Sequence, residues 1–167
     1  HWWHEGPDWL AAVLSALPEA GVRVTTLRGA AEAGHVGAPV QLGRSSWGSG
    51  KDWRVWEGPA VQDLNLAAKG VQERLLSTLD THRGPARDPV LDQLVREALL
   101  ALSSDWAFMV SHDSAAGYAR DRAAGHAGRL HALADRLDAG DQAGARALAD
   151  RLRVVDGPFG HLDARAF

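Results

Sequence analysis

The sequence contains no cysteine among its 167 residues, which excludes disulfide bonds and thiolate chemistry. It has no apolar run of the roughly 18 residues that a membrane-spanning helix needs, and its first residues lack the pattern of a signal peptide. Neither sign of charge dominates, since the formal net charge is −3, which argues against a nucleic-acid surface built on bulk positive potential. We therefore expect a cytoplasmic protein with neither a membrane nor a nucleic-acid partner.

The arrangement of apolar residues predicts a mainly α-helical protein. Residues 7–17 have a helical pattern and residues 22–27 alternate like a short strand, so the chain opens with a short αβ segment. Four later segments have the spacing of long amphipathic helices, which are residues 61–79, 89–102, 114–137 and 141–154. We expect these four to form an antiparallel helical domain. The predicted divisions are therefore residues 1–43, a tryptophan-rich loop at 44–58, and a helical domain at 59–167.

The most unusual feature is the placement of tryptophan. Six of the seven tryptophans lie within the first 56 residues, at positions 2, 3, 9, 47, 53 and 56. Trp9 falls on the apolar stripe of its predicted helix and is expected to be a core residue. Trp47 and Trp56 instead flank a loop of glycine, serine and charged residues, which cannot help to bury an indole. We interpret these two as ligand contacts, while Trp53 could either stack on a ligand or pack beneath the loop.

A carbohydrate is the ligand class that best suits this composition. Pyranose rings expose patches of C–H groups that stack on indole faces, while neighbouring polar side chains bond to the hydroxyls. Both kinds of group occur in the two segments that contain most of these tryptophans, residues 1–6 and 45–56.

Other candidate motifs are weaker. His1 and His4 have a spacing that could hold a metal, but this is weak support, and we expect neither a metal nor a cofactor. His126 and His131 are five residues apart on a helix and do not share a face, so solvated or capping roles are expected for both. The segment Ser111 to Ser114 contains residue types of a catalytic triad, but neighbouring residues rarely face one another, and we interpret it as the cap of the following helix.

Three blocks of sequence resemble glycoside hydrolase family 57. Residues 1–6, His-Trp-Trp-His-Glu-Gly, resemble the end of the family's fourth conserved region. Residues 45–56 resemble the tryptophan-bearing fifth region of the family's 1,4-alpha-glucan branching enzymes, and residues 103–108 resemble a further block in their helical domain. The blocks occur in the family's order and span nearly the whole chain. The usage of Ala, Arg, Asp and Gly resembles that of actinobacterial proteins.

This resemblance implies a retaining enzyme with an incomplete (β/α)₇ barrel, whose catalytic Glu and Asp would both precede residue 1. The chain would complete that upstream barrel and add the helical C-terminal domain. It would contain no catalytic residue and would therefore be inactive alone. Its substrate would be an alpha-1,4-glucan, cleaved and transferred to a 6-hydroxyl. The substrate-binding residues implied or inferred are His1, Trp2, Trp47, Trp53, Trp56, Asp105 and Trp106.

Several alternatives remain open at this point. A related amylase or 4-alpha-glucanotransferase would share the same blocks, because the choice among these reactions depends on acceptor geometry and on solvent exclusion. The chain could also be a glucan-binding module without local catalysis. A purely structural helical domain, with tryptophans packed against a partner, is the third alternative.

Overall fold

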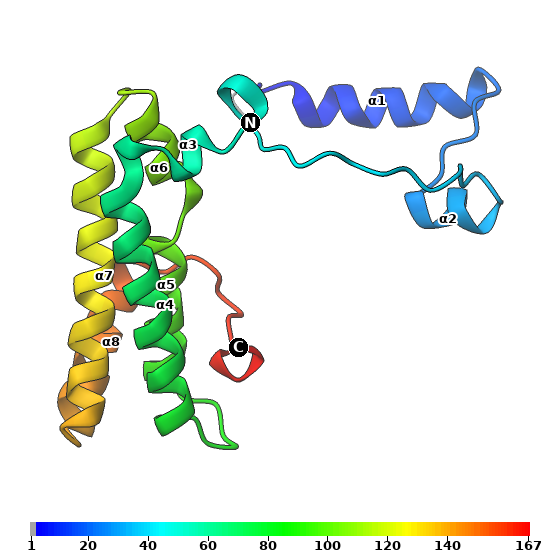
Figure 1. Cartoon of the computed structure of the whole chain (residues 1–167). Helices are drawn as coiled ribbons and strands as arrows, with labels where there is room; N and C mark the ends of the chain where they lie inside the picture. Colours follow the sequence, from blue (N-terminus) through cyan, green and yellow to red (C-terminus); the bar gives the residue numbers. More distant parts are fainter. Residues whose placement is uncertain (1–2) are drawn as a thin grey trace. The chain divides into compact units, whose positions relative to one another are not determined.

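The computed structural model describes residues 3–167 (Figure 1). It separates into two units, His1–Gly43 and Arg44–Phe167, which we describe individually. None of the helices in the described part of the chain is long and apolar enough to cross a membrane.

The first unit contains two helices, α1 (Gly6–Glu19) and α2 (Leu27–Glu32). Proline and aspartate in the first turn of α1 suit a helix start, as the sequence predicts. The rings of Trp3 and Trp9 pack with centroids 5.3 Å apart. However, no side chain of residues 3–43 is buried, and Trp9 remains 53% exposed. The expectation that Trp9 is a core residue is therefore wrong for the structure as described.

The strand predicted at residues 22–27 is not formed. Residues 22–26 have no regular secondary structure, and Leu27 already begins α2. A β-strand is stabilised by hydrogen bonds to a neighbouring strand, and the described residues contain no strand that could supply them. The β part of the predicted αβ segment is thus absent, and the described residues are helical or irregular.

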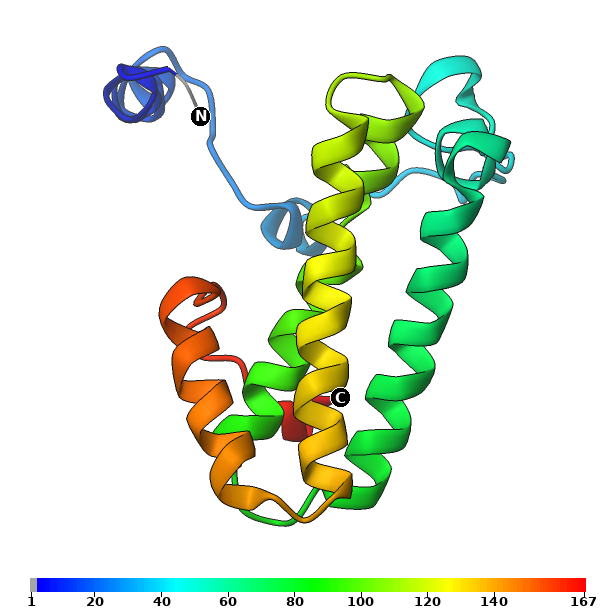
Figure 2. The same ribbon diagram turned by 90° about the vertical axis from the view of Figure 1, so that its left-hand side faces the viewer.

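The second unit is a helical domain in which the four predicted long helices are all present. They are α4 (Gln62–His82), α5 (Pro89–Ala101), α7 (Ala116–Asp138) and α8 (Gln142–Val155). Each runs antiparallel to the long helix before it (Figures 1 and 2). Shorter elements are η1 (Ser49–Lys51), α3 (Arg54–Glu57), η2 (Pro59–Val61), α6 (Ser104–Ser111) and η3 (Ala164–Ala166).

Helix α5 is the centre of this domain. All its residues from Val90 to Ala98 are buried, because α4, α7 and α8 pack around it. Leu94 of α5 and Leu130 and Leu133 of α7 are fully buried in the main core. Burial of each such leucine contributes about 1.5 to 3 kcal/mol. The side chain of Asp88 caps α5 by accepting a hydrogen bond from the amide of Val90 at 2.8 Å.

A smaller core lies around α6, a helix that is not among the four predicted from the sequence. Val61, Val110 and Ala119 form this core, with Trp106 packed against it. Residues 111–114 belong to the end of α6 and the turn after it, since α7 starts at Ala116 and has no side-chain cap. The interpretation of Ser111 to Ser114 as a cap of α7 is therefore wrong.

Candidate functional site

The loop that contains Trp47 and Trp53 is closed by short backbone contacts. Ser46 donates its amide to the carbonyl of Lys51 at 3.2 Å and its hydroxyl to the carbonyl of Asp52. Gly48 has a φ of +121°, and a Cβ placed there would lie 2.9 Å from Cγ2 of Val55. Glycine is therefore required at this position, both for the backbone conformation and for the close approach to Val55.

Helix α3 attaches the loop to the helical domain. Val55 is buried, and its carbonyl accepts a hydrogen bond from the hydroxyl of Ser111 at 2.6 Å. The side-chain amide of Asn65, on α4, donates to the carbonyl of Trp56 at 2.9 Å. Two consecutive carbonyls of α3 thus accept hydrogen bonds from side chains of α6 and α4, so the backbone at Trp56 has a fixed position in this unit.

Trp56 in turn positions Trp47. Its indole Nε1–H donates to the carbonyl of Trp47 at 2.8 Å. The ring of Trp56 also packs against Phe108 of α6, with centroids 6.2 Å apart. Trp47 itself leaves 78% of its surface exposed. The loop therefore holds one tryptophan as an anchor and presents another to solvent.

The three tryptophans line one open pocket, which we name the tryptophan pocket. Its lining residues are Ser45, Ser46, Trp47, Trp53, Trp56 and Ser104, and its volume is about 510 Å³. Ser104 comes from the start of α6, whereas the others come from the loop and α3. The sequence alone did not single out these serines, although two of them directly precede Trp47. Indole faces beside hydroxyl groups match the needs of a ligand that is apolar on its faces and polar at its edges.

Two cations lie against the indoles of the loop. The ammonium of Lys51 is 5.2 Å from the ring centroid of Trp47, and the guanidinium carbon of Arg44 is 5.4 Å from that of Trp53. These distances are typical of cation–π contacts. Both groups also bring hydrogen-bond donors to the aromatic surfaces.

The other predicted site residues have different surroundings. Asp105 is exposed and accepts a hydrogen bond from the hydroxyl of Ser103 at 2.8 Å, and it does not line the tryptophan pocket.

Trp106 donates from Nε1 to the carbonyl of Leu100 at 2.8 Å. It lines a neighbouring cavity of about 180 Å³ that shares Trp56 and Ser104 with the pocket. His1 and Trp2 lie outside the described residues.

A buried polar network crosses the main core and corrects the expectation for His126. This histidine is fully buried, not solvated, and its Nδ1 lies 2.8 Å from Oε2 of Glu97. Arg122 can only donate, and its Nη2 lies 2.9 Å from Nε2 of the same ring. The neutral imidazole therefore donates from Nδ1 and accepts at Nε2. Burial raises the pKa of Glu97, against the opposing effect of its hydrogen bonds from His126 and Gln93.

Glu97, His126 and Asp156 form a group with the composition of a metal site. Each residue offers one potential ligand atom, and these three atoms lie within 4.8 Å of one another. However, Glu97 is already bonded to Gln93 and His126, and Asp156 to Arg129 at 2.5 Å. The guanidinium groups of Arg122 and Arg129 also bring positive charge to the group. We assign the group a structural role, because a bound cation would have to break these bonds beside two positive charges.

One protein family matches most of the helical domain. The family model described as "1,4-alpha-glucan branching enzyme, C-terminal" matches residues 67–167. The chain belongs to this family. The match begins within α4 and continues to the last residue, so it includes the main core and the tail after α8.

Relatives of this branching-enzyme C-terminal domain extend the similarity to the loop and the first unit. A probable 1,4-alpha-glucan branching enzyme of Mycobacterium tuberculosis is 53% identical over 173 residues, which cover 99% of this chain and 33% of the relative. This similarity agrees with the actinobacterial character of the sequence. The 1,4-alpha-glucan branching enzyme of Thermococcus kodakarensis is 31% identical over 140 residues, covering 82% of this chain and 21% of the relative.

Two crystal structures share the fold of the branching-enzyme domain. The GH57-type branching enzyme of Pyrococcus horikoshii has a TM-score of 0.75 at 26% identity, with 99% of this chain and 32% of that chain covered. The GH57 branching enzyme of Thermococcus kodakaraensis, solved in complex with glucose and additives, has a TM-score of 0.77 at 30% identity and covers 97% of this chain and 30% of that chain. This chain thus spans about a third of the length of these relatives or less.

Proposed function

We propose that this domain is the C-terminal part of a retaining 1,4-alpha-glucan branching enzyme and that its tryptophan pocket binds the glucan. The observation that supports the pocket's role is the combination of an exposed Trp47, an anchored Trp56 and three serines around one opening. A glucan offers the matching alternation of C–H faces and hydroxyl edges. No other described pocket combines three tryptophans.

The proposed chemistry takes place outside this chain. A retaining mechanism needs two carboxyl groups about 5 to 5.5 Å apart, one as nucleophile and one as acid and base. The first breaks the α-1,4 bond and forms a covalent glycosyl-enzyme, and the second protonates the leaving oxygen. The 6-hydroxyl of another glucan then gives its proton to the second carboxyl group and attacks the intermediate, which forms the α-1,6 bond and releases the nucleophile. We assign both carboxyls to a preceding barrel, so the 167-residue chain alone would be inactive.

The pocket's proposed contribution is to hold a glucan chain near that barrel. A glycosyl-enzyme can also be attacked by water, which would give hydrolysis in place of branching. Aromatic surfaces that hold the acceptor chain raise its effective concentration and exclude solvent. Trp47 and Trp56 are the main proposed contacts and Trp53 flanks them. We assign His1 and Trp2 to the donor side, and Asp105 and Trp106 to an extension of the site.

We further propose that residues 1–43 complete the barrel, that residues 44–58 form the substrate loop, and that residues 59–167 form the helical domain. The exposed apolar side chains of the first unit support this division. Trp9, Leu10 and Leu14 of α1 are each about half exposed, and contact with a barrel would bury them. A cytoplasmic location remains part of the proposal and is supported by the absence of cysteine.

The experiment that tests this function uses the protein encoded by the complete open reading frame, incubated with amylose. New α-1,6 linkages are expected with the intact protein and none with the 167-residue chain alone. The double variant Trp47→Ala/Trp56→Ala should form fewer linkages. Reducing ends without branches would identify an amylase instead. A reading frame without a preceding barrel would contradict the branching proposal and favour a glucan-binding module.

A further inference from the structure

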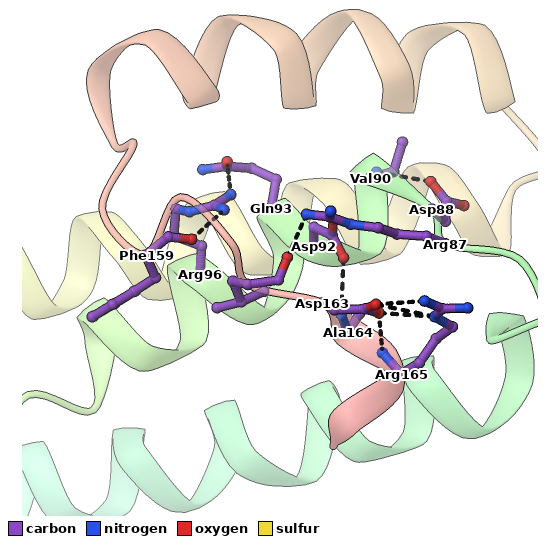
Figure 3. Close-up of polar contacts among 11 residues, drawn as sticks. Arg87, Asp88, Val90, Asp92, Gln93, Arg96, Phe159, Asp163, Ala164 and Arg165 are labelled. Atoms are coloured by element: carbon purple, nitrogen blue, oxygen red, sulfur yellow. Dashed lines mark hydrogen bonds and ion pairs between the residues drawn. The ribbon is translucent and has the colours of Figure 1, made fainter.

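Arg96, at the centre of α5, is a buried cation without an ionic partner. Only 2% of its surface is exposed. Its guanidinium donates to the carbonyl of Phe159 at 3.2 Å and to Oε1 of Gln93 at 2.6 Å (Figure 3). It also donates to the carbonyl of Pro158 at 2.6 Å. All three acceptors are neutral, and no carboxylate of the described residues lies within ion-pair distance of this guanidinium. Buried charges in proteins are normally paired with an opposite charge.

Arg96 lines a pocket between α5, α8 and the chain after α8, and two further arginines line it as well. The pocket has a volume of about 290 Å³, and its charged lining residues are Arg87, Asp92, Arg96, Asp150 and Arg153. Arg87 pairs with Asp92 at 2.6 Å and donates to the carbonyl of Leu162 (Figure 3). Arg153 donates to the carbonyl of Gly157 at 2.6 Å. We name this the arginine pocket.

The arginine pocket has more positive than negative charge. Its three guanidinium groups face two carboxylates, and Asp150 also pairs with Arg146 at 3.2 Å. Burial, and after it the charge of Arg153, lowers the pKa of the Arg96 guanidinium, although Asp92 and Glu97 act in the opposite direction. A bound anion would offset the repulsion between Arg96 and Arg153 and the cost of burying Arg96.

The arginines also retain free hydrogen-bond donors. A guanidinium has five N–H groups. The hydrogen bonds described above use three N–H groups of Arg96, two of Arg87 and one of Arg153. The remaining donors belong to guanidinium groups, whose planar geometry suits the oxygens of a phosphate group.

We propose that the arginine pocket is a binding site for a phosphate group held by Arg87, Arg96 and Arg153. A phosphate has about two negative charges near pH 7 and three free acceptor oxygens when esterified, which suits three cations better than a carboxylate would. The two sources of such a group are inorganic phosphate and a small phosphate ester. If the ligand is an ester, the carboxylates of Asp92 and Asp150 would accept hydrogen bonds from hydroxyl groups on its alcohol portion.

Binding at this site would stabilise the fold, because the three arginines connect α5 and α8 with the chain after α8. A ligand that binds only the folded state raises the free energy of unfolding with its concentration. The arginine pocket shares no residue with the tryptophan pocket. The proposal is therefore independent of the glucan-binding function.

The test is a titration of the 167-residue chain with sodium phosphate and with glucose 6-phosphate, followed by thermal unfolding and calorimetry, against sodium chloride at matched ionic strength. A saturable rise in melting temperature with phosphate but not chloride is expected. Tighter binding of glucose 6-phosphate would assign the site to an ester, and equal or weaker binding would assign it to inorganic phosphate.

Variants at the two more accessible arginines locate the site. Arg153→Gln and, as a second variant, Arg87→Gln should each weaken phosphate binding at least tenfold. Arg151→Gln is the matched control, because Arg151 is an exposed residue of α8 that does not line the pocket. An equal rise in melting temperature with chloride, or unchanged phosphate affinity in both pocket variants, would overturn the proposal.

Discussion

The indole N–H of Trp56 donates a hydrogen bond to the backbone carbonyl of Trp47, with 2.8 Å between the two atoms. This bond joins two tryptophans that are nine residues apart and gives them different roles. Trp56 is anchored through α3 and packs against Phe108, whereas Trp47 is largely exposed. The structure thus explains why the loop needs tryptophan, and not merely an aromatic residue, at position 56.

The first prediction concerns this donor. Trp56→Phe keeps an apolar ring but removes the indole N–H, so the carbonyl of Trp47 loses its partner. We expect a loss of about 0.5 to 1.5 kcal/mol in the free energy of unfolding, and weaker maltoheptaose binding because Trp47 is less restrained. Urea unfolding and calorimetric titration measure the two effects. Unchanged affinity in this variant would show that the bond does not position Trp47.

The second prediction concerns Gly48, where a side chain would meet Val55. Gly48→Ala places a Cβ 2.9 Å from Cγ2 of Val55 at a φ of +121°. We expect the strain to cost about 1 to 3 kcal/mol and to reduce glucan affinity by displacing Trp47. Gly84→Ala is the control, because no atom lies within 4 Å of a Cβ built there. Comparable effects of the two substitutions would contradict the proposed requirement for glycine.

The third prediction concerns the buried network around Glu97. Glu97→Ala leaves Gln93 and His126 without their buried acceptor. We expect the free energy of unfolding to fall by about 3 to 5 kcal/mol, as measured by chemical denaturation. Glu73→Ala removes an exposed carboxylate that lies 3.8 Å from Lys69, and should cost no more than about 0.5 kcal/mol. A loss below about 1 kcal/mol in Glu97→Ala would contradict the structural role of the network.

The fourth prediction concerns the pH dependence of the end of the chain. The hydrogen bond from the side chain of Arg165, with further bonds, lowers the pKa of Asp163 from 3.8 to about 2. The carboxylate therefore stabilises the folded state above pH 3.8, and this contribution is lost as the pH falls towards 2. We expect the amide of Arg165, which donates to Asp163 at 3.0 Å, to lose hydrogen-exchange protection across this range. This pH dependence of the protection should disappear in Asp163→Asn. Its persistence in that variant would show that another titratable group is responsible.

The long helices could be predicted from the sequence because each has a repeated apolar face and a clear boundary. Pro89 starts α5 as expected, and Ser103 separates α5 from α6. The short helix α6 was missed because eight residues show too little periodicity. The strand at 22–27 failed for a different reason, since alternation indicates a strand only where a partner strand exists.

The site was only partly predictable. Trp47 and Trp56 could be found because indoles beside glycine and serine have no local means of burial. Ser104 could not be placed with them, because its contact with the pocket depends on the packing of α6 against the loop. The expectation of a solvated or capping role for His126 was wrong, since its spacing from His131 gave no indication that Glu97 of another helix would face it.

The most direct test of the central claim is the affinity of the Trp47→Ala variant for maltoheptaose. It is measured by calorimetric titration of the protein encoded by the complete open reading frame, with Phe167→Ala as a control for loss of an exposed aromatic residue. Because Trp47 is exposed, the free energy of unfolding should change by no more than about 0.5 kcal/mol. We predict that maltoheptaose binds roughly ten times more weakly to Trp47→Ala, a change of about 1.4 kcal/mol, and normally to the control. Equal affinity of the intact protein and Trp47→Ala would contradict the claim that the tryptophan pocket binds glucan.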